Sequence, residues 1–128
     1  MKKAIHIVII ILIIFGFCLS EQLVAKKFYD ETKEQVEIIE SLSNSWENNL
    51  EKITIESQKL ENMWKNRTMI LWTFISHKEL KELGVEINRL KSSAEENNSD
   101  LFYESLNLVF YYLDNYQTLT EINLQNIF

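Results

Sequence analysis

The chain has 128 residues with one cysteine, two glycines and no proline, and 46% of its residues are apolar. This length allows one small domain, and a single cysteine excludes a framework of internal disulfides. The net charge is −6, and the chain lacks the clustered lysines and arginines that neutralise phosphates, so we expect no binding to nucleic acid. A mostly β protein needs many turns, and turns favour glycine and proline. The composition therefore indicates an α-helical protein.

The first segment predicts a helix that interacts with a membrane. After two lysines, residues 4–19 are almost entirely apolar. As a helix they would span about 24 Å, and continuing the helix to residue 25 gives about 33 Å, enough to cross the hydrocarbon core of a bilayer. We therefore expect residues 1–25 to form an N-terminal membrane anchor that contacts lipid, and residues 26–128 to form a separate body.

The charge pattern predicts which way the protein crosses the membrane. Lys2 and Lys3 precede the apolar segment, whereas acidic residues follow it. Because basic residues tend to stay on the cytoplasmic side, we expect a single-pass protein of the cell membrane with a cytoplasmic N-terminus and an extracytoplasmic body. The alternative is a signal peptide cleaved after Cys18 or Ser20, which would also export the body.

The rest of the chain has the pattern of amphipathic helices. Apolar residues recur every three or four positions, as expected when one face of each helix is buried. The pattern covers residues 28–42, 46–64, 80–94 and 101–116. Polar clusters at 41–45 and 95–100 provide short turns between antiparallel neighbours. We therefore predict an all-α fold, with an N-terminal transmembrane helix followed by an antiparallel helical bundle.

Two stretches have a less regular pattern. Residues 68–75 are rich in β-branched and aromatic side chains and fit either a helix or an extended connector, and helix is preferred because a lone strand would lack a partner. Residues 118–128 close the chain, and Thr120 is predicted to cap a short separate helix that follows it. Between these stretches, Ser76 and Glu79 fit a capping box, which predicts that a helix begins at His77.

Bulky residues indicate the core of the bundle. Trp46 and Trp64 lie at the two ends of a heptad seam, so we expect both rings to be core residues rather than the walls of a ligand cleft. Gly84 lies beside the seam of the following helical stretch. A residue without a side chain at that position lets another helix approach closely.

No arrangement of residues predicts a catalytic, cofactor or metal site. His77 and Glu79 are two positions apart, and on a helix they would point about 200° apart, so they cannot chelate one metal ion. The other histidine, His6, lies inside the apolar segment. We therefore expect a protein that is not an enzyme and that needs no cofactor.

Aromatic residues are unusually dense in the stretch after residue 100. Tyr111 and Tyr112 are consecutive, and consecutive helical positions lie about 100° apart, so the two rings cannot face one core together. Some of these rings should remain exposed, and exposed Tyr and Phe commonly anchor protein interfaces. The predicted partner surface comprises Phe102, Tyr103, Phe110, Tyr111, Tyr112 and Tyr116.

The layout of the whole chain resembles a known family. A basic start and an apolar anchor are followed by a Trp-bearing helix, then by Trp72 and the sequence His77-Lys78-Glu79-Leu80, and the chain closes with residues 121–128, Glu-Ile-Asn-Leu-Gln-Asn-Ile-Phe. This layout is similar to bacterial domain-of-unknown-function family 4363, small single-anchor envelope proteins that are often encoded beside YetF-like membrane proteins. The resemblance implies a location in the cell envelope and a membrane-protein partner, and it supplies no catalytic residue.

Together these observations predict a non-catalytic accessory protein. Its partner would be another membrane protein, a YetF-like protein among the candidates, or a second copy of the chain. The alternative is an extracytoplasmic bundle that senses a ligand. A cavity lined by convergent polar groups would favour the ligand, whereas a filled core with an exposed aromatic stripe would favour the partner.

Overall fold

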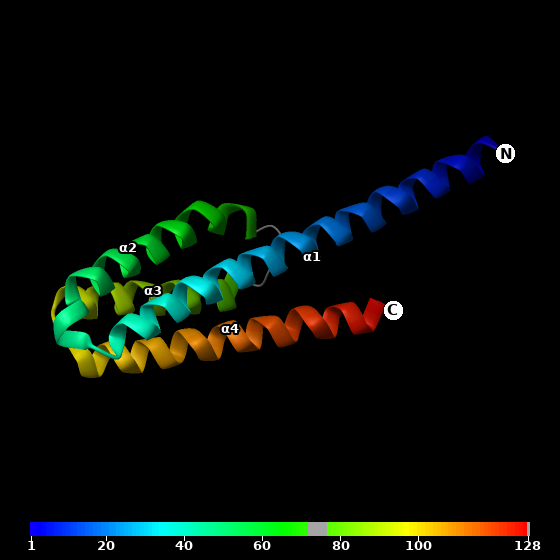
Figure 1. Ribbon diagram of the computed structural model, residues 1–128. Helices are drawn as coiled ribbons and strands as arrows, with labels where there is room; N and C mark the ends of the chain where they lie inside the picture. Colours follow the sequence, from blue (N-terminus) through cyan, green and yellow to red (C-terminus); the bar gives the residue numbers. More distant parts are fainter. Residues whose placement is uncertain (72–76, 128) are drawn as a thin grey trace.

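Four helices make up the described part of the protein (Figure 1). The computed structural model describes residues 1–71 and 77–127, without the side chains of residues 22, 69–71, 77, 79 and 116–127. The helices are α1 (Lys2–Ser43), α2 (Trp46–Leu71), α3 (His77–Glu95) and α4 (Ser99–Ile127). No strand occurs within these described ranges, and the predicted all-α fold is confirmed.

The helices form an antiparallel bundle in which successive helices run in opposite directions (Figure 1). α1 packs against α2 and α4, and α3 packs against the same two helices. Two short turns, at residues 44–45 and 96–98, lie at one end of the bundle, which we call the distal end. The apolar half of α1 leaves the bundle at the opposite end, which we call the anchor-side end.

α1 is one continuous helix with two different halves. An 18-residue stretch of its N-terminal half has a mean hydropathy of 2.6, and none of it is buried within the protein. By length and composition α1 can cross a membrane, although a signal sequence has the same properties. From Ala25 onward the helix is amphipathic and buries Phe28, Val36 and Ile39 against the other helices. The apolar segment and the first helix of the bundle are therefore one continuous helix.

The core is a continuous layer of apolar side chains from all four helices. The predicted seam of α3 is fully buried, and Trp46 and Trp64 pack against the core. Trp64 also lies against Gly84, where a Cβ atom would come within 2.8 Å of the indole Nε1. This contact confirms the predicted close approach. The buried apolar residues of α3 are Leu80, Leu83, Ile87, Leu90 and Ala94.

The structure shows the conformation of part of the two less regular stretches, residues 68–75 and 118–128. α2 remains helical through Leu71, so residues 68–71 are helix, and residues 72–75 lie outside the described residues. The described part of α3 runs from His77, and the predicted Ser76–Glu79 capping box lies outside the described atoms. The predicted short helix starting at Thr120 is wrong, because α4 continues without interruption to Ile127. α4 contains neither Gly nor Pro, and a single Thr costs too little helix stability to end it.

Candidate functional site

The structure separates the six predicted partner-surface residues into different environments. Phe102 is fully buried in the core near the distal end, so it is corrected from a surface residue to a core residue. Its position on α4 faces the other helices, and burying such a ring is strongly favourable. Phe110 is partly buried and packs against the same core. The side chain of Tyr116 lies outside the described atoms.

Tyr103 is exposed but has a structural contact at the distal end. Its side chain is 40% exposed, yet its hydroxyl donates a hydrogen bond to the backbone carbonyl of Ser43 at 2.6 Å. Its ring lies 6.2 Å from that of Trp46, measured between centroids. The Trp46 indole in turn donates to the Asn97 side chain at 2.8 Å. These contacts tie the end of α1 and both distal turns to α4.

The backbone of the α3–α4 turn explains why Asn97 occupies its position. Asn97 has φ of 55°, in the left-handed region that asparagine tolerates better than most residues. The next residue, Asn98, donates its backbone N–H to Ser93 O at 2.9 Å and accepts from the Leu101 N–H at 3.1 Å through its side chain. The distal end is therefore closed by specific hydrogen bonds in addition to aromatic packing.

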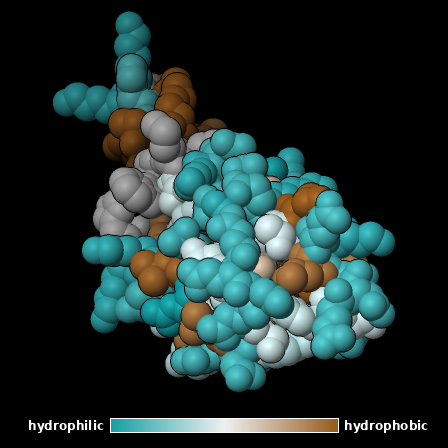
Figure 2. Space-filling view, turned by 90° about the vertical axis from the view of Figure 1, so that its left-hand side faces the viewer, coloured by the Kyte–Doolittle hydropathy of each residue, from teal (hydrophilic) through white to brown (hydrophobic). Residues whose placement is uncertain are grey.

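Figure 2 looks directly at the distal end. This face is mostly hydrophilic and carries small, separate apolar patches, while the apolar part of the molecule projects from behind it. Small scattered apolar patches are normal on soluble surfaces and do not by themselves indicate an interface.

Tyr111 and Tyr112 lie near the anchor-side end and line a groove between α3 and α4. Their rings contact each other edge to face at 5.6 Å between centroids. Tyr111 is 58% exposed, and within the described residues its hydroxyl makes no hydrogen bond, whereas Tyr112 is partly buried against the core. The groove has a volume of about 350 Å³ and is lined by Lys78, Leu80, Glu82, Leu83, Tyr111, Tyr112 and Asn115.

The electrostatic surroundings keep the Tyr112 hydroxyl protonated. Burial raises the pKa of Tyr112 above its ordinary value of 10.0, and the carboxylates of Glu82 and Glu86 raise it further. Arg89, which pairs with Glu86 at 3.2 Å, acts in the opposite direction. At neutral pH the groove therefore offers a phenol that can donate a hydrogen bond, beside a lysine and a glutamate.

The position of the groove relative to the apolar half of α1 follows from one hydrogen bond. The hydroxyl of Tyr29 in α1 donates to the carboxylate of Asp114 in α4 at 3.5 Å. Asp114 is adjacent in sequence to the groove residues of α4, and Tyr29 is four residues beyond Ala25. Four residues of helix correspond to about 6 Å, so the groove lies close to the point where the apolar segment leaves the bundle.

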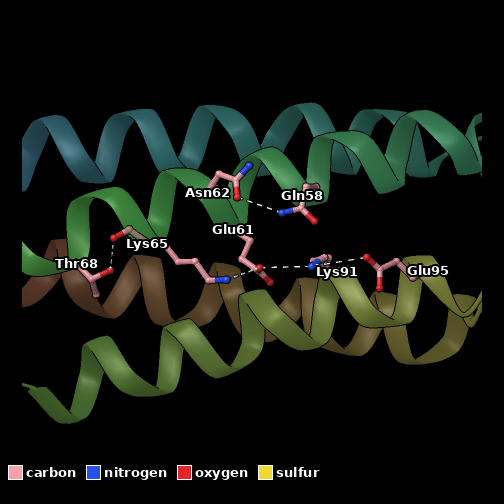
Figure 3. Close-up of polar contacts among 7 residues, drawn as sticks. All are labelled: Gln58, Glu61, Asn62, Lys65, Thr68, Lys91 and Glu95. Atoms are coloured by element: carbon pink, nitrogen blue, oxygen red, sulfur yellow. Dashed lines mark hydrogen bonds and ion pairs between the residues drawn. The ribbon is translucent and has the colours of Figure 1, made fainter.

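A separate ion cluster joins α2 to α3 (Figure 3). The Oε1 atom of Glu61 accepts from Lys65 at 2.9 Å and from Lys91 at 3.4 Å, and Lys91 also approaches Glu95 at 3.7 Å. The Glu61 side chain is 6% exposed. Its burial raises the pKa, but the two lysines outweigh this effect and hold the pKa of Glu61 below its ordinary value of 4.5. The cluster is a structural link between two helices.

The polar residues of the groove were not predicted from the sequence. Lys78 and Glu82 are four residues apart on α3, and Tyr111 and Asn115 are four residues apart on α4, so each pair shares one helical face. This spacing was present in the sequence. What the sequence lacked was the pairing of α3 with α4 that places the two faces on one groove.

Comparison with known proteins identifies a family. No curated protein and no solved structure matches the chain. A family model described as a domain of unknown function, DUF4363, matches residues 21–127. The match covers most of the chain, including the whole amphipathic part of α1 and the three helices that complete the bundle. The chain therefore belongs to the DUF4363 family.

Proposed function

We propose that this protein is a membrane-anchored accessory protein, and that its α3–α4 groove docks onto another membrane protein on the extracytoplasmic side. The observation that carries the proposal is the environment of Tyr111. This ring is 58% exposed, pairs edge-on with Tyr112, and lines a groove that lies about 6 Å along the helix axis from residue 25, the end of the predicted anchor.

The chemistry of the groove suits a protein partner. Tyrosine provides a rigid apolar ring and a hydroxyl that can form hydrogen bonds, and such residues dominate the binding energy of many interfaces. Lys78 and Glu82 add charges of both signs at the edge of the groove, where charges favour one partner over another. A partner that reaches a site next to the bilayer surface is most simply another protein embedded in the same membrane.

The membrane topology is the first part of the proposal to test. In a Cys18→Ala background, an Asn98→Cys variant places a thiol at the exposed distal turn. On intact cells stripped of their wall, an impermeant thiol reagent should label this position and should leave an Ala4→Cys control, which keeps both N-terminal lysines, unlabelled until lysis. Protection of position 98 until lysis would contradict the orientation.

The docking surface is the second part. Tyr111→Ser should weaken capture of a membrane-protein partner from solubilised membranes, because it removes the exposed ring of the groove. Ile55→Ser is the matched control, since Ile55 is equally exposed at 58% but lies on α2. Equal capture by both variants and the parent would contradict docking at the groove.

Ligand sensing is the second candidate, and one observation favours it. The groove volume of about 350 Å³ falls at the lower end of the range for small-molecule sites, and its lining includes Lys78, Glu82 and Asn115. A small molecule that raises the melting temperature of the parent but not of Lys78→Gln would support this function over protein docking.

A further inference from the structure

α4 continues well past the groove toward the apolar half of α1. It is 29 residues long and ends at Ile127. Two hydrogen bonds fix its register against α1: Tyr103 with Ser43 at the distal end, and Tyr29 with Asp114 near the anchor-side end. Figure 1 shows the two helices running in opposite directions, with the end of α4 extending out of the bundle on the same side as the N-terminal half of α1 and diverging from it.

The register gives the depth that the end of α4 reaches. Ile127 lies thirteen residues beyond Asp114, about 20 Å along the helix axis. Thirteen residues back from Tyr29 along α1 is Gly16, and counting the same way from the Tyr103–Ser43 contact makes Ile127 level with Leu19. The end of α4 is therefore level with residues 16–19, the last turn of the apolar segment. The last turns of α4 therefore lie level with the part of α1 that would occupy the membrane.

The sequence of α4 changes where it passes this level. Residues 95–114 carry five acidic residues and no basic one, whereas residues 115–127 carry a single charge, Glu121. The apolar residues of the second stretch are Leu119, Ile122, Leu124 and Ile127. Charged side chains are costly in a bilayer, while uncharged polar and apolar residues are tolerated at its interface. The loss of charge thus coincides with the predicted depth.

We infer that residues 119–127 of α4 lie among the headgroups and outer acyl chains of the lipid leaflet next to the body, as a second membrane contact beside α1. This inference rests on the membrane anchoring in the proposed function. The register favours lipid as the neighbour of these residues. The last turns of α4 reach the level at which α1 would be surrounded by lipid. Two membrane contacts would also hold the body at a fixed tilt, with the α3–α4 groove near the bilayer surface.

Depth-dependent fluorescence quenching tests this placement on the full chain. Single cysteines in a Cys18→Ala background are labelled with an environment-sensitive dye at position 122, at position 12 in the apolar segment, and at position 107 on the exposed face of α4. The labelled proteins are reconstituted into phosphatidylcholine–phosphatidylglycerol vesicles that contain a nitroxide quencher on the lipid acyl chain. Position 12 reports anchoring, and position 107 reports a part of α4 within the bundle.

The inference predicts a loss of fluorescence at positions 12 and 122 and none at position 107. Quenching at 12 but not at 122 would overturn the inference and leave the anchor in place. The same conclusion would hold if a second copy of the chain, and not lipid, covered position 122. An unquenched position 12 would overturn the anchoring and the inference together. Quenching at 107 as well would overturn the placement, because the whole body would then lie on the bilayer.

Discussion

The two ends of the bundle use aromatic residues in different ways. At the distal end Tyr103 is 40% exposed, but its hydroxyl binds Ser43 and its ring contacts Trp46. Near the anchor-side end Tyr111 is 58% exposed, and its described contacts are to the neighbouring ring of Tyr112. Exposure alone is therefore a poor guide to a binding surface. The contacts of the polar atom on the ring distinguish a structural tyrosine from one available to a partner.

The topology explains this difference. The distal end contains both short turns, and the aromatic side chains there hold three chain segments together. On the anchor side, α1 and α4 continue past the groove, so no turn has to be closed between them. No turn between α1 and α4 therefore needs an aromatic side chain near the groove.

The largest expected effect is at the distal end. Phe102→Ala removes a fully buried ring in contact with Trp46 at 4.8 Å between centroids, and should lower the free energy of unfolding by about 3–5 kcal/mol. Thermal unfolding of the full chain in mild detergent, followed by near-ultraviolet circular dichroism, measures the change. An unfolding midpoint equal to that of the parent would contradict the assignment of Phe102 to the core.

The ion cluster between the two ends should affect stability in a pH-dependent way. Glu61→Gln removes the nearer of the two carboxylates beside the partly buried Lys91, and should cost about 1–3 kcal/mol at neutral pH. Because the pKa of Glu61 is lowered in the folded protein, its stabilisation is present above the ordinary value of 4.5 and is lost as the pH falls through the folded pKa. The difference between variant and parent should therefore shrink on acidification, and a constant difference from neutral to acidic pH would contradict the role of the charge.

A smaller effect distinguishes the two exposed tyrosines directly. Tyr103→Phe removes only the hydroxyl that donates to Ser43, and should cost about 0.5–1.5 kcal/mol. Tyr111→Phe is the matched control and should leave the free energy of unfolding unchanged, since its hydroxyl has no hydrogen bond among the described residues. Equal effects in a urea titration would remove the distinction between the two ends.

The smallest effect is expected for the whole Tyr111 side chain. Tyr111→Ser should change the free energy of unfolding by less than about 0.5 kcal/mol, as is usual for exposed positions. Chemical unfolding of the variant and parent in the same detergent measures this change. A loss as large as that of Tyr103→Phe would show that Tyr111 supports the fold, and its effect on partner capture could then be indirect.

Most of the fold follows from local patterns in the sequence. The three- and four-residue spacing of apolar side chains correctly predicted the seam of α3 from Leu80 to Ala94, and the polar clusters correctly marked both distal turns. The extent of α4 was missed, because Thr120 has the type of a capping residue but no helix-breaking residue lies near it. A capping residue ends a helix only when the backbone has another favourable conformation to adopt.

The candidate site was predicted less completely, because it depends on contacts between helices. The sequence showed that Tyr111 and Tyr112 cannot face one core, but it did not show that Phe102 is fully buried in that core. The lining of the groove by Lys78 and Glu82 requires the register of α3 against α4. Helical periodicity gives the face of each residue and gives no information on which neighbouring helix that face meets.

The central claim is that the partner-binding surface lies near the anchor-side end of α4 and not at its distal end. A photoreactive amino acid at position 111 and the same residue at position 103, both exposed on the same helix, compare the two ends in native membranes. We expect a cross-linked adduct with a second membrane protein from position 111 and none from position 103. An adduct from position 103 alone, or equal adducts from both positions, would contradict it.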